Sequence, residues 1–484
     1  MNINKILNIK LILKIISFNL FLVALSLVSC VAVALYYFED YMPFIYASFV
    51  SLVIGITMFL FSKEDEEKDL KKKDAYFVVT ASWILMSVVG ALPYVFSNSI
   101  PSFIDAVFES VSGFSTTGAS ILTDVEILPK SILFWRSLTH WIGGIGIIVL
   151  VIIIMPSLKI GGYHLFSSES SFQDKIKPRI KAIGKRLLWI YILLTFFEIV
   201  LLIAGNMSVF DSVCHSFGTV ATGGFSTKNT SIAGYSPYIQ YIITLFMFLA
   251  GTNFVIHYYL IKRKFSKIAQ NEEFVFYVIL TSIIGFIITF SLFYHMNKPF
   301  EESFREAFFQ VVTIITCTGF ATADYLQWPT YAWAIIFFSM FLGACTGSTT
   351  GGIKMVRHLI LFKNIKNTFR QKIHHNAILP IKINNNVLSS ENNSSTLSFI
   401  FLYLMIFVIG SVLLILSGVD WQSSAGATAT CMAGIGPGIG TVGPVSNFAH
   451  LPDFSKIVLS FIMIIGRLEI YTFMILFTKS YWKY

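Results

Sequence analysis

The chain has 484 residues, of which 55% are hydrophobic and 13% are charged, and 47 of them are phenylalanine. These proportions exclude an ordinary soluble protein, in which about 25% of residues are charged. The formal net charge of +9 would suit nucleic-acid binding. The basic residues, however, are concentrated in those segments between apolar stretches that would face one side of a membrane. We therefore expect a membrane protein with no nucleic acid as a partner.

Ten apolar segments are long enough to cross a hydrocarbon core about 30 Å thick, which takes about 20 helical residues. The predicted spans are 12–38, 42–62, 75–96, 131–155, 187–205, 238–261, 274–296, 331–362, 396–418 and 457–479. The first contains "LVSC", which could end a lipoprotein signal at Cys30. Because the apolar run continues beyond Cys30, we predict an uncleaved first span.

Lysine and arginine gather in the segments that share one side if the spans alternate. These are Lys5 to Lys14, Lys63 to Lys73, Lys159 to Arg186, Lys262 to Lys267, Lys354 to Lys382, and Lys479 and Lys483. The positive-inside rule makes that side cytoplasmic and puts both termini there. The five cysteines lie far apart without CxxC spacing, so we predict no disulfide framework and no cysteine metal site.

A short motif recurs between the later spans. "DAVFESVSGFSTTGAS" begins at Asp105, "DSVCHSFGTVATGGFS" at Asp211 and "EAFFQVVTIITCTGFA" at Glu306, and in each the acid precedes a glycine by 13 residues. A looser copy, "DWQSSAGATATCMAGIGPGIG", begins at Asp420. The repeated unit is therefore a span, a short segment, a Thr/Gly loop and a second span, used four times.

The segment from acid to loop has about 10 residues, too few to cross the bilayer but enough for a re-entrant helix. We expect the acid to cap that helix. Non-helical backbone at membrane depth must be buried in protein or line a cavity. One such loop alone is more simply a tight turn, but four in register predict a ring of carbonyl and hydroxyl oxygens that replaces the water shell of a cation.

The predicted fold is an all-α integral membrane protein with four tandem span, re-entrant loop, span repeats in pseudo-fourfold arrangement, preceded by two extra helices. The expected divisions are 1–74 for the two-helix extension and linker, and 75–160, 161–270, 271–395 and 396–484 for repeats 1 to 4. The cytoplasmic segments 157–186 and 363–395 are either docking surfaces or solvated charge.

These features resemble the superfamily of potassium transporters that contains TrkH, TrkG, KtrB and HKT. The loops "TTGAS", "TGGFS", "CTGFATAD" and "GIGPGIG" carry the resemblance, and the two extra spans and the GPG of loop four favour the TrkH/TrkG branch. The resemblance implies potassium uptake across a bacterial inner membrane, a homodimer and a cytosolic nucleotide-binding regulatory subunit similar to TrkA. It implies potassium as the transported ion and no bound cofactor.

By the same resemblance, potassium ligands come from three residues of each loop: Thr116, Thr117 and Gly118; Thr222, Gly223 and Gly224; Cys317, Thr318 and Gly319; and Gly434, Ile435 and Gly436. Glycine in the third position of all four is the pattern that the family associates with potassium over sodium. Cys317 replaces a frequent threonine, and the fourth loop lacks a frequent asparagine. Sodium or mixed monovalent cation transport is therefore the alternative.

Two features are candidates for gating. "GACTGSTTGGIK", Gly343 to Lys354, interrupts the apolar run 331–362 and matches the family's intramembrane gate loop, with Gly347, Ser348, Thr349, Thr350, Gly351 and Gly352 inside it. A small-residue packing face is the alternative. Arg467 lies inside the last predicted span, at a cost of about 3 kcal/mol unless it faces an interior or a water-filled path. The resemblance implies that it repels cations below the filter. A buried ion pair with Glu469 or Glu198 is the alternative, and it is compatible with that role.

Enzymatic chemistry has little support, because the sequence contains no GxxxxGK[ST], HExxH or GxSxG motif. An unrelated secondary transporter built from inverted repeats is the stronger alternative. The roles of Arg136 and His257 stay open, with interhelical hydrogen bonding favoured. The sequence does not decide between channel-like and ion-coupled transport.

Overall fold

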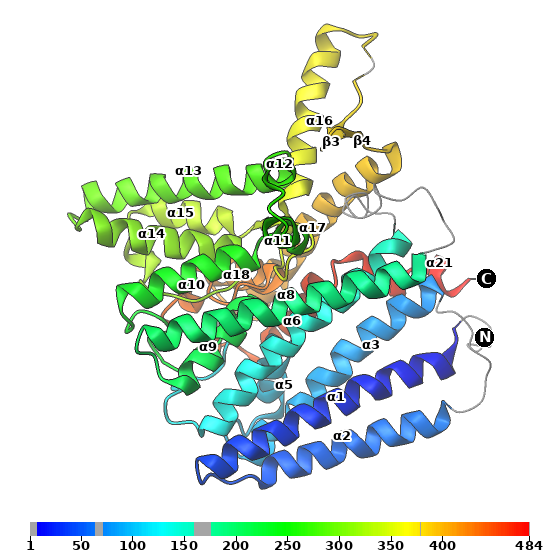
Figure 1. The fold of residues 1–484 in the computed structure, drawn as a ribbon, viewed down its shortest axis with the longest axis vertical. Helices are drawn as coiled ribbons and strands as arrows, with labels where there is room; N and C mark the ends of the chain where they lie inside the picture. Colours follow the sequence, from blue (N-terminus) through cyan, green and yellow to red (C-terminus); the bar gives the residue numbers. More distant parts are fainter. Residues whose placement is uncertain (1–6, 63–70, 159–175, 378, 484) are drawn as a thin grey trace.

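The computed structural model describes residues 7–62, 71–158, 176–377 and 379–483. Its long helices lie side by side, with one helix, α16, running across them and projecting from the body (Figure 1). Among the described residues, six helices are long and apolar enough to cross a membrane, or up to eight if each of two bent helix pairs is one span. The predicted span 131–155 coincides with a further helix, α6.

The chain begins with a helical hairpin, α1 (Ile9–Tyr36) and α2 (Met42–Phe61). The α1 helix continues past Cys30, as predicted for a span. The hydroxyl groups of Ser48 and Ser51 on α2 donate to carbonyl oxygens of α1 at 3.2 and 2.9 Å. The hairpin packs beside the first repeat through α3.

The first two repeats have the predicted order of elements. Repeat 1 consists of α3 (Lys72–Gly90), α4 (Leu92–Phe96), α5 (Phe103–Phe114) and α6 (Lys130–Leu158). Repeat 2 consists of α8 (Ile176–Ala204), α9 (Val209–Ala221), α10 (Pro237–Ala250), α11 (Phe254–Ile261) and α12 (Phe265–Ala269). The short helices α5 and α9 are the predicted re-entrant helices.

The last two repeats are more interrupted. Repeat 3 consists of α13 (Glu272–His295), α14 (Phe300–Ile315), η3 (Tyr325–Gln327), α15 (Thr330–Ser339), β1 (Leu342–Gly343), β2 (Ile353–Lys354) and α16 (Met355–Ile373). The antiparallel pair β3 (Lys382–Ile383) and β4 (Asn386–Val387) follows. Repeat 4 consists of α17 (Ser390–Leu416), α18 (Trp421–Ala433), η4 (Gly440–Val442), α19 (Asp453–Arg467), α20 (Tyr471–Met474), η5 (Ile475–Phe477) and α21 (Lys479–Trp482). Here α14 and α18 are the re-entrant helices.

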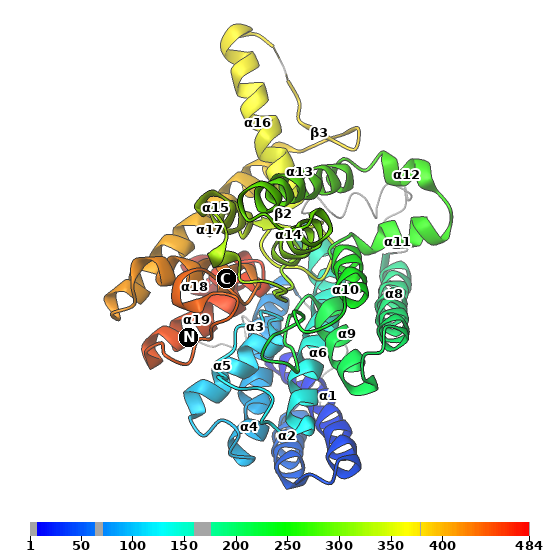
Figure 2. The same ribbon diagram turned by 90° about the vertical axis from the view of Figure 1, so that its left-hand side faces the viewer.

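The repeats follow one another around a common centre (Figure 2). At three of the four junctions the second helix of one repeat packs on the re-entrant helix of the next: α6 on α9, α10 on α14, and α19 of repeat 4 on α5 of repeat 1. The largest apolar core joins the N-terminal hairpin with repeats 1 and 4 and part of repeat 2. A second core joins repeats 3 and 4, and a third joins repeats 2 and 3. This cyclic packing is the predicted pseudo-fourfold arrangement.

Three predicted spans are not continuous helices. The segment 238–261 bends by 104° between α10 and α11, and 457–479 bends by 110° between α19 and α20. The segment 331–362 ends as a helix at Ser339 and resumes at Met355. At the first bend the side chain of Asn253 caps α11 by accepting a hydrogen bond from Val255 N. This gives a partner to a backbone N–H group that has no acceptor within the helix because of the bend.

The prediction that the acids cap the re-entrant helices is wrong for three of the four. Ser102 and Ser208 cap α5 and α9, while Asp105 and Asp211 lie in the first turn. Glu306 lies further along α14 and bonds Lys298 at 2.8 Å. Asp420 alone is a cap, accepting from Ser423 N at 2.9 Å. Serine is as good a cap as aspartate, and a first-turn acid still favours the positive end of the helix.

Both ends of the described chain meet at one face. Asn8 N, beside the start of α1, donates to Asp74 on α3 at 2.8 Å, and Tyr481 donates to Lys73 O at 2.8 Å. The α16 helix also leaves the body near the start of α13 (Figure 1), where Lys363 on α16 pairs with Glu272. Of the two expected cytoplasmic surfaces, 363–395 forms the end of α16, the β3–β4 pair and the start of α17. Residues 159–175 of the other lie outside the described ranges.

Candidate functional site

The loops that follow the four re-entrant helices share one backbone conformation. We call them Thr/Gly loops 1 to 4: Thr116–Gly118, Thr222–Gly224, Cys317–Gly319 and Gly434–Gly436. The first residue of each has φ of 54°, 57°, 54° and 74°, and the third has φ of 80°, 80°, 85° and 98°. Such values suit glycine, which fills the third position throughout. The first position is left-handed even with threonine or cysteine, a strain that concentrates at functional sites.

One hydrogen bond holds this conformation in every loop. The middle residue of each loop donates its N–H to the carbonyl five residues earlier, in the last turn of the re-entrant helix. These bonds are Thr117 to Ser112 (2.9 Å), Gly223 to Gly218 (2.8 Å), Thr318 to Thr313 (2.8 Å) and Ile435 to Thr430 (2.9 Å). The looser sequence of loop 4 therefore keeps the geometry of the other three.

The four loops close into a ring, in which the third glycine of each loop lies against carbonyl oxygens of the next. A Cβ on Gly118 would be 2.1 Å from Gly223 O, on Gly224 2.0 Å from Thr318 O, on Gly319 1.7 Å from Ile435 O, and on Gly436 2.9 Å from Thr117 O. No side chain fits at these distances. The structure thus brings together all twelve residues predicted from the four loops.

A buried ion pair connects the segments that follow loops 1 and 2. Arg136 on α6 bonds Glu109 on α5 through Nε at 2.9 Å and NH2 at 2.8 Å, and both side chains are almost fully buried. The carboxylate also accepts from Ser120 Oγ and Ile121 N, and Arg136 donates to Ser226 O at 3.2 Å. Glu109 was not predicted as a site residue, although an acid within an apolar segment is a signal for such a pair.

His140 on α6 joins the end of α5 to Phe225, the residue that follows loop 2. Its Nδ1 lies 2.8 Å from Gly113 O, and Phe225 N donates to its Nε2 at 3.2 Å. Outside the spans, Asn229 accepts from Val125 N and donates to Asp124 at 2.7 Å. That hydrogen bond lowers the pKa of the Asp124 carboxyl. Arg136 and His140 on α6 therefore form hydrogen bonds to neighbouring helices and loops. This is the role that was favoured for Arg136.

The predicted intramembrane loop, Gly343 to Lys354, crosses beneath the ring. Its two ends pair as the parallel strands β1 and β2. Thr349 Oγ1 donates to Val220 O at the end of α9, at 3.1 Å. A Cβ on Gly351 would be 2.0 Å from Ala433 O at the end of α18, and one on Gly352 would be 3.6 Å from Cys317 Sγ in loop 3. The loop therefore contacts three of the four repeats beside their Thr/Gly loops.

The same loop is fastened to the bend between α10 and α11 and to α13. Cys345 N donates to Gly251 O at 3.0 Å, and Phe254 N donates to Gly347 O at 3.2 Å. Buried Glu273 accepts from Thr346 N and Oγ1 at 2.6 and 2.9 Å and from Val356 N at 3.2 Å. Glu273 was missed because it precedes the predicted span 274–296. His257 Nε2 lies 2.9 Å from Leu249 O and so bonds across the bend.

Arg467 lies at the end of α19 and points at this loop. Its NH1 donates to Thr349 O and its NH2 to Gly143 O on α6, both at 2.8 Å. Glu469 pairs with Arg357 instead, and both carboxylate oxygens of Glu198 lack a hydrogen-bond partner in the described chain. The predicted alternative of an Arg467 pair with Glu469 or Glu198 is therefore wrong. Two of the three guanidinium nitrogens are thus bonded to carbonyl oxygens, and a guanidinium stays positively charged in proteins.

Lys354 brings a second cation to the same place. It is buried and donates to Thr350 O and, at 2.9 Å, to Thr350 Oγ1. Thr350 and Ser348 bond each other at 2.9 Å. A cavity of about 20 Å³ lies among Gly347, Ser348, Gly351, Lys354, Arg467 and their neighbours. That is room for about one water molecule. The loop beneath the ring therefore leaves little open space, and Lys354 and Arg467 make this space positively charged.

The comparisons with known proteins agree with this architecture. The family model "TrkH: Cation transport protein" matches residues 42–484. The chain is 36% identical to Trk system potassium uptake protein TrkH of Escherichia coli K12, covering 90% of this chain and 91% of that protein. It is 35% identical to TrkG of the same strain, covering 98% and 99%.

A solved structure gives the same result. The crystal structure of the potassium transporter TrkH from Vibrio parahaemolyticus matches with a TM-score of 0.90 and 32% identity, covering 98% of this chain and 99% of that one. The fold and the ring of loops define an all-α membrane transporter, which confirms the predicted fold class. The chain belongs to the TrkH family of cation transport proteins. An unrelated inverted-repeat transporter is thereby excluded.

Proposed function

We propose that this chain mediates potassium uptake across the bacterial inner membrane through the ring of Thr/Gly loops. The observation that carries the proposal is the closed cycle of contacts between each third glycine and the carbonyls of the next loop. Relatives named potassium uptake proteins match over nearly the whole chain, which supports potassium as the ion.

In this proposal the carbonyl oxygens of loops 1 to 4 replace the hydration shell of potassium, with the twelve loop residues as the filter. The re-entrant helices end at Phe114, Ala221, Ile315 and Ala433, with at most one residue between each helix and its loop. Their C-terminal ends add negative potential where the cation loses water. Because backbone carbonyls supply most ligands, Cys317 changes little. Sodium or mixed cation transport is the competing function.

The intramembrane loop is the proposed gate. Its residues Gly343 to Lys354 lie against loop 3 and the ends of α9 and α18, and Arg467 and Lys354 add two positive charges there. A cation that leaves the filter meets both charges across a low-dielectric region, which opposes passage. The gate therefore opens when the loop and Arg467 separate, and the glycines at 347, 351 and 352 permit that movement.

The remaining expectations belong to the same proposal. Both termini face the cytoplasm, the chain forms a homodimer, and a cytosolic TrkA-like nucleotide-binding subunit docks on the 363–395 surface and controls the gate. The chain itself carries no enzymatic step. The four repeats divide at 74/75, 160/161, 270/271 and 395/396, after a two-helix extension.

Growth of a potassium-uptake-deficient bacterium at low external potassium tests the function. Expression of this chain with a Trk regulatory subunit should restore growth, and an empty vector should not. Failure to restore growth, with the chain verified in the membrane and the regulatory subunit present, would contradict potassium uptake.

A further inference from the structure

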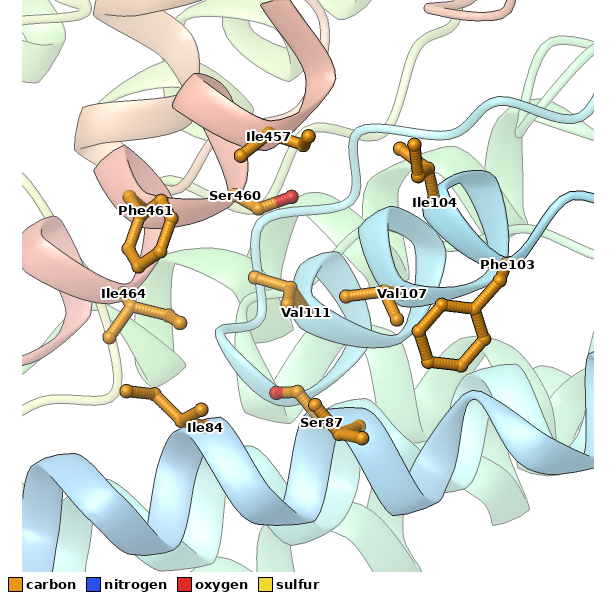
Figure 3. A pocket seen from close by; sticks show the side chains of 11 residues that line it. Ile84, Ser87, Phe103, Ile104, Val107, Val111, Ile457, Ser460, Phe461 and Ile464 are labelled. Atoms are coloured by element: carbon orange, nitrogen blue, oxygen red, sulfur yellow. The ribbon is translucent and has the colours of Figure 1, made fainter. Parts of the chain in front are cut away.

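A second feature of the membrane region lies outside the ring, between repeats 1 and 4. An apolar crevice of about 260 Å³ opens where α3, α5 and α19 meet. Figure 3 shows side chains from the three helices around this space, with Val107 and Val111 on α5 facing Phe461 and Ile464 on α19. The crevice is a separate feature from the intramembrane loop.

The crevice has a buried floor and an exposed apolar rim. Ser87, Val111 and Ile464 are between 1% and 4% exposed, and they form the floor. The rim residues are 36% to 53% exposed, and they are Ile84, Val88, Phe103, Ile457 and Phe461. The opening is therefore continuous with the outer apolar faces of α3 and α19.

The position of the crevice specifies what fills it. Ile84 and Val88 lie within the membrane span that α3 and α4 form together, Lys72–Phe96. An apolar space does not hold ordered water, and leaving it empty would forfeit the dispersion contacts of its walls. In a bilayer the neighbouring apolar molecules are lipid tails, which pack on such walls as well as side chains do.

The polar residues beside the crevice, Asp105, Lys456 and Ser460, already form bonds within the protein. Lys456, next to rim residue Ile457, bonds Asp105 at 2.6 Å and is almost fully buried. Ser460 Oγ donates to Lys456 O at 2.8 Å. This pair joins α19 to α5, and because Lys456 is already bonded to a carboxylate it is not available to a phosphate. Recognition therefore depends on the lipid tail rather than the headgroup.

We propose that this crevice binds one acyl chain of a phospholipid from the leaflet around the N-terminal end of α5. The chain lies against Val107 and Val111, on the same helix that leads into loop 1. It thus packs behind the α5 re-entrant helix as a side chain of a neighbouring helix would. The proposal does not depend on which cation the ring conducts.

Photolabelling from lipid tails tests this directly. The full-length protein is reconstituted in vesicles that contain phosphatidylglycerol or phosphatidylethanolamine with a diazirine on one acyl chain, irradiated and mapped by peptide mass spectrometry. We expect the segments 103–111 and 457–464 to be labelled severalfold more than the exposed face of α17 around Val408, and equally by both headgroups. Labelling no greater than that of α17 would overturn the proposal, as would an unlabelled crevice covered by a second copy of the chain.

Filling the crevice supplies the matched comparison. Val107→Trp puts an indole into the crevice, whereas Val408→Trp adds the same bulk to an exposed position on α17. We expect the first variant to lose most crevice labelling and the second to keep it, with both eluting as wild type does in size-exclusion chromatography. If Val107→Trp does not fold, Ile457→Trp on the opposite wall replaces it. Unchanged crevice labelling in the folded variant would contradict the proposal.

Discussion

The guanidinium group of Arg467 donates a hydrogen bond to the carbonyl oxygen of Thr349 at 2.8 Å. Thr349 in turn donates to Val220 O, the residue that precedes the end of α9. Two hydrogen bonds therefore connect the fourth repeat, the intramembrane loop and the helix that leads into loop 2. This chain of contacts links the proposed gate to the proposed filter.

Removing the charge of Arg467 should open this barrier in part. A unit charge about 10 Å from a permeating cation raises its energy by about 1.7 kcal/mol at an effective dielectric of 20. We expect Arg467→Gln to raise cation flux through the reconstituted protein by about 10- to 20-fold, and Arg467→Lys to raise it much less. Arg370→Gln, on the exposed end of α16, is the control. Lower flux in Arg467→Gln at equal protein would argue against the gating role.

Loosening the other anchor of the loop should have a similar effect. Glu273→Ala leaves the buried N–H groups of Thr346 and Val356 without their acceptor, at about 1–3 kcal/mol each. We expect a higher background flux, and a smaller rise for Glu273→Gln, which retains a carbonyl oxygen. Neighbouring Glu272 pairs with Lys363 instead, so Glu272→Ala is the matched control. Equal flux in the two alanine variants would remove Glu273 from the gate.

The ring contact of Gly224 predicts a loss of uptake. In Gly224→Ser the Cβ would be 2.0 Å from Thr318 O, and the residue would keep φ near 80°. If the displaced carbonyl costs potassium binding about 1.4 kcal/mol, uptake at low external potassium falls about tenfold. Gly234→Ala is the control, since its Cβ would meet Thr230 Oγ1 at 3.4 Å. Full uptake by Gly224→Ser would exclude Gly224 from the filter.

The buried pair of Glu109 and Arg136 should matter for stability. Glu109→Ala leaves an unpaired buried cation, which costs about 3–5 kcal/mol, so we expect a clearly lower thermal unfolding midpoint. Glu126 pairs with Lys228 at the surface, with both side chains more than 40% exposed, and Glu126→Ala should cost about 1 kcal/mol at most. A Glu109→Gln, Arg136→Met double variant should lose less than the sum of its single variants. Similar midpoints for Glu109→Ala and Glu126→Ala would contradict this account.

The four loops could be predicted because their chemistry is local. A third-position glycine such as Gly319 and a first-position residue such as Cys317 recur at fixed spacing, and that spacing sets the left-handed conformations. The re-entrant helices were predicted for the same reason. Their caps were not, because Ser102 and Ser208 compete with the acids three residues later.

The bends and buried pairs depend on tertiary contacts. The sequence Gly251-Thr252-Asn253 weakly indicated the 104° bend, because a glycine is typical of a helix end and an asparagine of the cap of the next helix. The second bend had none, since Ile470 adopts φ of 49° despite its β-branched side chain. Glu109 and Arg136 lie 27 residues apart, and their pairing requires α5 and α6 to pack.

The most direct test of the central claim is the ratio of potassium to sodium flux through the purified chain in liposomes, with one cation gradient at a time. If the carbonyl ring is the filter, potassium flux should greatly exceed sodium flux, and Gly224→Ser should bring the two closer together. Equal potassium and sodium flux through the wild-type chain would contradict the claim that this ring selects potassium.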